Sequence, residues 1–172
     1  MLVPILAAAP HGVIFVERAQ HLRRHPGQIG FPGGIEDPVD AGDPVRTALR
    51  ELREELGIEA ERVTVVGQLS DVEQTFNRFV ITPVVGVLDE HSRFALDGEE
   101  IAGLFTVPLA AILARGAIRD DPERSAAARG KTIYSFEYEG RRVWGFTARV
   151  LKSFADAWQA PGSTLRDALS SQ

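Results

Sequence analysis

The 172-residue chain contains no cysteine. Disulfide bonds, thiolate nucleophiles and cysteine-ligated zinc are therefore excluded. The compartment stays open on this count, with the cytoplasm as the default expectation. Long apolar runs are also missing, since none approaches the ~20 residues that a membrane-spanning helix needs. We therefore expect no membrane partner.

An excess of positive charge is absent as well, because 19 Lys and Arg stand against 24 Asp and Glu, a formal net charge of -5. A protein that grips a nucleic-acid backbone needs a basic surface, so nucleic acid is not an expected partner. An anionic small-molecule substrate would be attracted locally instead. With 44% hydrophobic and 25% charged residues, the chain is expected to form one globular domain over residues 1–172.

A helix is predicted over residues 44–56. Asp43 is a good N-cap, Pro44 suits the first helical position, and Gly57 stands where a left-handed C-terminal residue is wanted. Apolar residues at helical spacing form one stripe that should face a core. The stripe consists of Val45, Ala48, Leu49, Leu52 and Leu56.

Three carboxylates, Glu51, Glu54 and Glu55, lie on another side of this helix. Their mutual repulsion costs a few tenths of a kcal/mol per pair unless a cation neutralises them. Mg²⁺ or Mn²⁺ would suit, because both prefer hard oxygen ligands. A solvated acidic face, paired with nearby arginines, is the alternative. The helix alone does not decide between these two interpretations.

The segment before the helix, residues 31–44, reads FPGGIEDPVDAGDP. Gly33 and Gly34 let the backbone pass close to a metal or a phosphate. Together with the helix, this segment resembles the Nudix signature, in which a glycine loop leads to R-E-U-x-E-E-x-G-U, with U aliphatic. The matching residues are Arg50, Glu51, Leu52, Glu54, Glu55, Gly57 and Ile58.

The loop itself departs from the signature. Gly34 stands two residues farther from Arg50 than in the common pattern, and Gly42 occupies the place of the usual loop glutamate. Asp37 or Asp40 is the expected substitute. The resemblance implies an α/β (α+β) fold with a mixed sheet sandwiched between helices, and a metal-dependent hydrolase of nucleoside diphosphate compounds.

Residues 18–34, RAQHLRRHPGQIGFPGG, resemble the second motif of the coenzyme A diphosphatase branch, R-[SA]-x3-R-x3-G-x3-F-P-G-G. The residues in register are Arg18, Ala19, Arg23, Gly27, Phe31, Pro32, Gly33 and Gly34. Guanidinium groups suit multidentate phosphate recognition, so Arg18 and Arg23 are expected to bind substrate with Gly33 and Gly34. A merely solvated arginine loop is the alternative.

This resemblance implies coenzyme A or its derivatives as substrate, split into 4′-phosphopantetheine, or its acyl form, and adenosine 3′,5′-bisphosphate. Another nucleoside diphosphate compound, such as ADP-ribose, a nucleotide sugar or a dinucleotide, is the nearer rival. A Nudix-fold module that senses a nucleotide without cleaving it is the other. The oligomeric state and any acyl preference are not predicted.

The resemblance also implies roles for individual residues. Glu51, Glu54 and Glu55 would hold Mg²⁺ or Mn²⁺, and one of the three would double as the base that orients water. Glu51 and Glu54 are therefore taken as catalytic candidates. Arg50, four residues before Glu54, would brace the glutamates. Possible accessory acids are Glu100 and Glu73.

Periodicity and composition predict the remaining elements. Strands are expected at residues 13–17, 63–69, 79–88 and 132–138, and helices around 108–114 and 147–158. The apolar start, MLVPILAAAP, is interpreted as a core strand rather than a signal peptide, because it lacks a basic leader. Residues 120–131 are predicted to form a polar loop and are a candidate lid.

Overall fold

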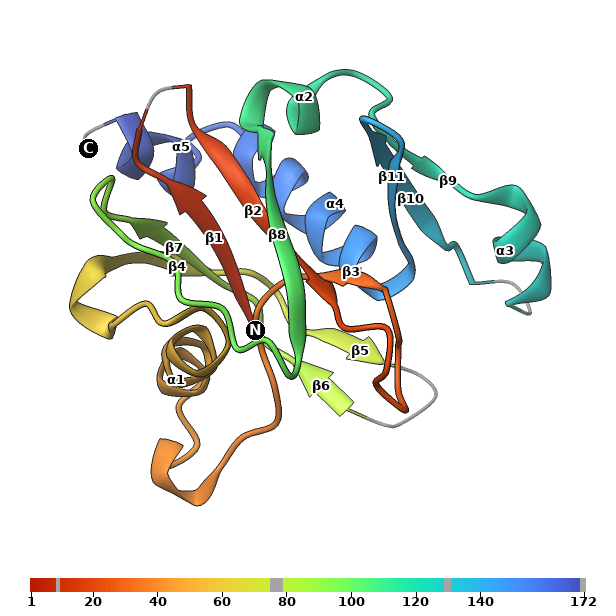
Figure 1. Ribbon diagram of the computed structural model, residues 1–172. Coiled ribbons are helices and arrows are strands. Elements are labelled where there is room, and N and C mark those ends of the chain that lie inside the picture. Colours follow the sequence, from red (N-terminus) through yellow and green to blue (C-terminus); the bar gives the residue numbers. More distant parts are fainter. Residues whose placement is uncertain (9, 75–78, 129–130, 171–172) are drawn as a thin grey trace.

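The computed structural model describes residues 1–8, 10–74, 79–128 and 131–170. A mixed sheet with strand order β3-β2-β1-β7-β4, to which β8 adds by pairing with β2, lies at its centre (Figure 1). The strands are β1 (Leu2–Leu6), β2 (Gly12–Arg18), β3 (Ile29–Gly30), β4 (Val63–Gln68), β7 (Val84–Leu88) and β8 (Ile101–Pro108). β1 runs parallel to β7 and antiparallel to β2, so the predicted N-terminal core strand is confirmed.

Two long helices cover opposite faces of this sheet (Figure 1). They are α1 (Pro44–Leu56) and α4 (Gly145–Gln159). Side chains of a strand alternate between faces, and β2 follows this rule: Val13 and Phe15 join the core cluster under α4, whereas Ile14 and Val16 join the cluster under α1. The predicted fold class, a mixed sheet sandwiched between helices, is confirmed.

Helix α1 begins and ends where the sequence predicts. The Asp43 carboxylate accepts a hydrogen bond from the Val45 N–H at 2.8 Å. Gly57 adopts a left-handed φ of 68° and its N–H donates to the Arg53 carbonyl oxygen at 2.9 Å. Both ends of the helix are thus held by their own local hydrogen bonds.

Smaller elements surround the sandwich. The pair β5 (Val72–Gln74) and β6 (Phe79–Ile81) forms a ribbon, and a second small sheet has the order β11-β10-β9. Its strands are β9 (Ile118–Asp120), β10 (Tyr134–Tyr138) and β11 (Arg141–Trp144). Short helices complete the described chain: η1 (Pro38–Asp40), η2 (Ala60–Arg62), α2 (Leu109–Leu113), α3 (Pro122–Ala127) and α5 (Thr164–Ser170).

Two predictions about elements were wrong. The single strand expected over residues 79–88 is two strands in different sheets, β6 and β7. Pro83 stands between them and has no N–H to donate to a strand ladder. The loop expected over residues 120–131 contains α3, which starts because the Asp121 carboxylate accepts from the Arg124 N–H at 3.2 Å and Pro122 suits the first helical position. Residues 129 and 130 of that segment lie outside the described residues.

Among the described residues, no helix is both long enough and apolar enough to cross a membrane.

Candidate functional site

Arg50 lies at the centre of a charged network that joins α1 to the preceding loop. Its Nη1 donates to Glu51 Oε1 and to Glu54 Oε2, each at 2.9 Å. Its Nη2 donates to the Ile35 carbonyl oxygen and to Asp40 Oδ2, each at 3.0 Å, and its Nε donates to Asp40 Oδ1 at 3.1 Å. One guanidinium therefore fixes two helix carboxylates relative to the glycine loop.

Asp40 is the loop acid that reaches Arg50. Its side chain is only 3% exposed. The hydrogen bonds from Arg50, and next the one from the Asp37 N–H, lower the pKa of Asp40 to about 2. Asp37 itself is exposed and caps η1 by accepting from the Val39 N–H. Of the two acids that the sequence suggested, the structure brings Asp40 to the site.

Two of the three helix carboxylates are withdrawn from water. Glu55 is 6% exposed, and burial, with the nearby charge of Glu51, raises its pKa to about 8. The Gly33 N–H donates a hydrogen bond to Glu55 Oε2 at 3.2 Å, and this bond lowers the pKa of Glu55, against the effect of burial. Burial also raises the pKa of Glu51, against the effect of Arg50. Glu54 is exposed at the rim.

The glycine loop lies directly against these carboxylates. A Cβ added at Gly34 would stand 2.2 Å from Glu51 Oε1, so the close approach requires glycine. The α-amino group of Met1 also lies near Glu51 and Glu55; burial lowers its pKa and the two negative charges oppose that effect. The loop and the helix thus form one concentrated acidic site.

The side chains fit a hard divalent cation by chemistry. Three carboxylates supply oxygen ligands, and a cation would favour the charged form of buried Glu55. Within the described part of the chain, however, no three His, Asp or Glu side chains are already gathered around a metal position. Arg50 pairs with Glu51 and Glu54 instead, so it supplies the positive charge that these two carboxylates contact.

Not all of the predicted substrate-binding and accessory residues lie at the acidic site. Arg18, at the end of β2, has a 28% exposed side chain whose Nη2 lies 3.8 Å from Glu100 Oε2. The charges of both residues act on the pKa of Glu55, so the structure brings Arg18 and Glu100 to the acidic site. Arg23 is exposed between β2 and β3. Glu73, on β5, instead lines a separate hollow with Tyr134 and Arg149.

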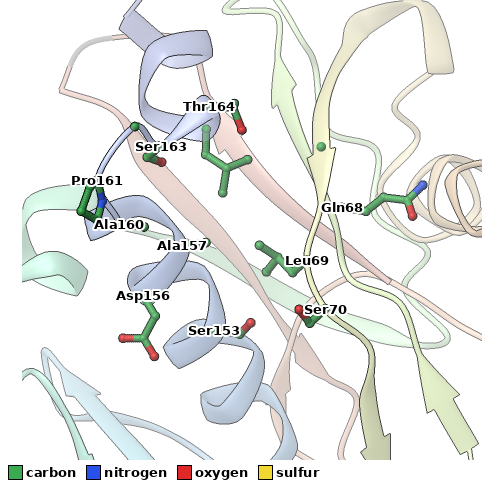
Figure 2. Close-up of a pocket in the computed structure, with 13 residues that line it drawn as sticks. Gln68, Leu69, Ser70, Ser153, Asp156, Ala157, Ala160, Pro161, Ser163 and Thr164 are labelled. Carbon is green, nitrogen blue, oxygen red and sulfur yellow. The ribbon is translucent and has the colours of Figure 1, made fainter.

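That separate hollow was missed by the sequence reasoning. Its lining comes from β5, from the segment leading into β10, and from α4, and no spacing rule connects residues so distant in the chain. A further hollow of about 480 Å³ lies between the β4–β5 connection and the α4–α5 region (Figure 2). Its lining contains Ser70, Ser153, Asp156 and Ser163 but no Lys, Arg or His. An anionic ligand is therefore not expected there.

Comparison with known proteins finds matches over most of the chain. The sequence pattern of the NUDIX domain matches residues 2–127. A Yersinia enterocolitica protein described as an uncharacterized Nudix hydrolase, NudL, is 37% identical over 157 residues, which are 90% of this chain and 78% of that protein.

Two solved structures share the fold. A NUDIX hydrolase from Alicyclobacillus acidocaldarius has a TM-score of 0.54 at 17% identity, covering 99% of this chain and 93% of that one. A MutT/nudix family protein from Enterococcus faecalis has a TM-score of 0.55 at 14% identity, covering 96% of this chain and 65% of that one. At these identities the likeness concerns the fold alone.

Proposed function

Because the chain belongs to the Nudix hydrolase family, we propose that it cleaves the diphosphate bond of coenzyme A and its acyl derivatives. The products are 4′-phosphopantetheine, or its acyl form, and adenosine 3′,5′-bisphosphate. The observation that carries the chemistry is the group of Glu51, Glu54 and Glu55, which the glycine loop contacts and Arg50 braces. The choice of coenzyme A is supported by the arginine-bearing motif of residues 18–34.

Glu51, Glu54 and Glu55 are the proposed ligands of Mg²⁺ or Mn²⁺. When bound, such an ion supplies Lewis acidity that offsets the negative charge of the diphosphate. The Gly33 N–H keeps one oxygen of Glu55 oriented by its 3.2 Å hydrogen bond. Burial of Glu55 excludes water from this carboxylate and strengthens its attraction for a cation.

Glu51 or Glu54 is the proposed base. A water oxygen bonds to one phosphorus, the bond from that phosphorus to the bridging oxygen breaks, and the water proton passes to the carboxylate. Arg50 is a positioning residue in this scheme, because it holds one oxygen of each glutamate. The Asp40 hydrogen bonds raise the pKa of Arg50, so its positive charge persists at every working pH.

Arg18 and Arg23 would then serve different parts of the substrate. Arg18 lies beside Glu55 and Glu100, which suits a contact to the diphosphate. Arg23 is exposed and suits the ribose 3′-phosphate, which only coenzyme A and its derivatives carry among the rival substrates. Gly33 and Gly34 are proposed to contact the substrate through their backbone groups, in a loop that approaches Glu51 closely at Gly34.

A product assay on coenzyme A, dephospho-coenzyme A and ADP-ribose tests this function, with Mg²⁺, Mn²⁺ or EDTA. We expect coenzyme A to have the highest kcat/KM, activity to vanish in EDTA, and Arg23→Met to reduce the preference for coenzyme A over dephospho-coenzyme A. Faster turnover of ADP-ribose would overturn the substrate assignment.

Glu54→Gln tests the metal chemistry separately. Its side chain is half exposed, so the substitution should leave the fold intact. We expect turnover of every diphosphate to fall at least about 100-fold, as for loss of a group acting in general base catalysis. Unchanged turnover in a folded Glu54→Gln variant would refute the proposed role and favour a site that only senses nucleotides.

A further inference from the structure

The hollow that contains Glu73 has no role in the chemistry proposed above. We name it the Arg149 hollow. It measures about 410 Å³ and is lined by Glu73, Lys131, Thr132, Tyr134 and Arg149. Small-molecule sites in proteins typically measure about 300–1,000 Å³. The hollow therefore has room for a nucleoside-sized group.

Its side chains offer three complementary kinds of contact. Tyr134 presents an aromatic ring, on which a nucleobase can stack. Lys131 and Arg149 bring positive charge, which attracts phosphate. Glu73 brings a carboxylate, which can accept a hydrogen bond from an exocyclic amino group of a base. A purine nucleotide carries all three matching groups.

The walls of the hollow are held by the fold. Arg149 lies on α4 and its Nη2 donates to the Thr132 carbonyl oxygen at 3.3 Å. Tyr134 lies on β10 and packs against the core cluster under α4. The Lys152 ammonium stands 6.0 Å from the centre of the Tyr134 ring. These contacts keep the ring and the guanidinium in place before a ligand arrives.

A short segment, residues 30–34, links α4, one wall of the hollow, to the acidic site. A Cβ added at Gly30 would stand 3.8 Å from Thr147 Oγ1, in the same turn of α4 as Arg149. Four residues later, a Cβ added at Gly34 would stand 2.2 Å from Glu51 Oε1. Four residues span at most about 14 Å even when fully extended. A ligand that holds its diphosphate at Glu51 can therefore extend its nucleoside toward α4.

We propose that the Arg149 hollow binds the purine end of the nucleotide substrate, with the base on Tyr134 and its amino group at Glu73, while the positive charges of Lys131 and Arg149 attract the anionic nucleotide without taking the ribose 3′-phosphate assigned to Arg23. This inference rests on the proposed function for the identity of the nucleotide. It adds a separate subsite for the base, apart from the carboxylates that act on the diphosphate.

Binding without turnover tests the subsite. Calorimetric titration of the full chain with adenosine 3′,5′-bisphosphate and with AMP, in EDTA, reports affinity independently of catalysis. We expect Tyr134→Leu and Arg149→Met each to weaken both ligands by at least about tenfold, a typical cost of losing a stacking or phosphate contact. Arg115→Met is the matched control, because Arg115 is exposed and lines another hollow. It should bind as the wild type does.

A second comparison isolates the contact to the base. Glu73→Gln should reduce the preference for AMP over IMP, which has a carbonyl oxygen where AMP has its amino group. Wild-type affinity in both Tyr134→Leu and Arg149→Met would overturn the proposal. If the protein does not cleave coenzyme A but these variants still bind AMP more weakly than the wild type, the substrate assignment is wrong and the nucleotide subsite is supported.

Discussion

Arg50 concentrates the electrostatics of the site in one side chain. It bonds Glu51 and Glu54 through Nη1, and Asp40 and the Ile35 carbonyl oxygen through Nη2. Without Arg50 both groups of acids would be destabilised, because the helix glutamates repel one another and buried Asp40 would lack a counter-charge. The arginine lets a loop of unusual length keep the geometry that the helix carboxylates need.

Replacing Asp40 should therefore reduce catalytic activity although all three proposed metal ligands remain in place. Asp40→Asn keeps the shape but loses the charge that orients Arg50, and we expect kcat/KM to fall by about 10- to 100-fold, as for other residues that orient ligand side chains. Asp37→Asn is the control, because exposed Asp37 does not contact Arg50. Steady-state kinetics measure kcat/KM for both variants. Equal losses in Asp40→Asn and Asp37→Asn would argue against a role for the hydrogen bonds between Asp40 and Arg50.

Glu55 should make the metal-free protein less stable as pH rises. Burial raises its pKa from 4.5 to about 8, so between these values the folded protein keeps a proton that the unfolded chain releases. This contribution to stability is complete below pH 4.5 and is lost as pH passes about 8. For one proton the slope is at most about 1.4 kcal/mol per pH unit.

Urea unfolding in EDTA between pH 5.5 and 8.5 measures this slope. The wild type should lose stability relative to Glu55→Gln across the range, while Glu54→Gln, changed at the exposed neighbour, should follow the wild type. Parallel curves for wild type and Glu55→Gln would show that Glu55 does not titrate in this way.

At the scale of elements, the end of α1 is set by Gly57. Its φ is 68°, and an added Cβ would stand 2.8 Å from Ala95 Cβ and 3.0 Å from the Ala95 carbonyl oxygen. Gly57→Ala should lower the free energy of unfolding by about 1–3 kcal/mol from backbone strain, with a further loss from this clash. Gly116→Ala is the control, since its φ is 77° but an added Cβ meets nothing within 4 Å. If urea unfolding gave the same loss of stability for Gly57→Ala and Gly116→Ala, the clash with Ala95 would not contribute to the effect.

An alanine in the glycine loop, at Gly34, should change the free energy of unfolding little but should reduce catalytic activity. At Gly34 the atoms nearest to an added Cβ belong to the flexible end of Glu51, with Oε1 2.2 Å away, so the carboxylate can move aside at small cost. We expect Gly34→Ala to change unfolding by less than about 1 kcal/mol. Its kcat/KM should fall by at least about tenfold, because a displaced catalytic group loses much of its effect. Gly98→Ala, where an added Cβ meets nothing within 4 Å, should change neither quantity, and full activity in Gly34→Ala would contradict the expectation.

At the scale of the whole molecule, one sheet serves two cores. β2 sends Val13 and Phe15 to the cluster under α4, and Ile14 and Val16 to the cluster under α1. Because the same strand supports both, neither helix can leave the sheet without exposing one face of a strand whose other face holds the other helix. Unfolding should therefore be a single cooperative transition.

Metal bound beside α1 should thus stabilise the far side of the molecule. The chain has two tryptophans, Trp144 and Trp158, at the start and in the last turn of α4. At a Mg²⁺ concentration 100 times Kd, the free energy of unfolding should rise by about 2.7 kcal/mol. Tryptophan fluorescence and helical circular dichroism should report the same shift, and EDTA should reverse it. A shift in one signal only would mean that the two faces unfold separately.

Local chemistry could be predicted from the sequence, and contacts between distant segments could not. Asp43, Pro44 and Gly57 fix the ends of α1 through hydrogen bonds within a few residues, so the helix and its three carboxylates were predictable to the residue. The resemblance to the Nudix family likewise implied a mixed sheet covered by helices on both faces. Pro83, by contrast, was overlooked as a break between β6 and β7, although its missing N–H was a usable signal.

The sequence by itself thus determined the family, the carboxylate-bearing helix and the glycine loop, because each depends on neighbours along the chain. Only the tertiary structure decided that Asp40 rather than Asp37 meets Arg50, since both acids are plausible by spacing and burial selects one. It also decided that Glu73 lies in the Arg149 hollow. Such placements depend on how a sheet and two helices bring separate segments together, which no local rule contains.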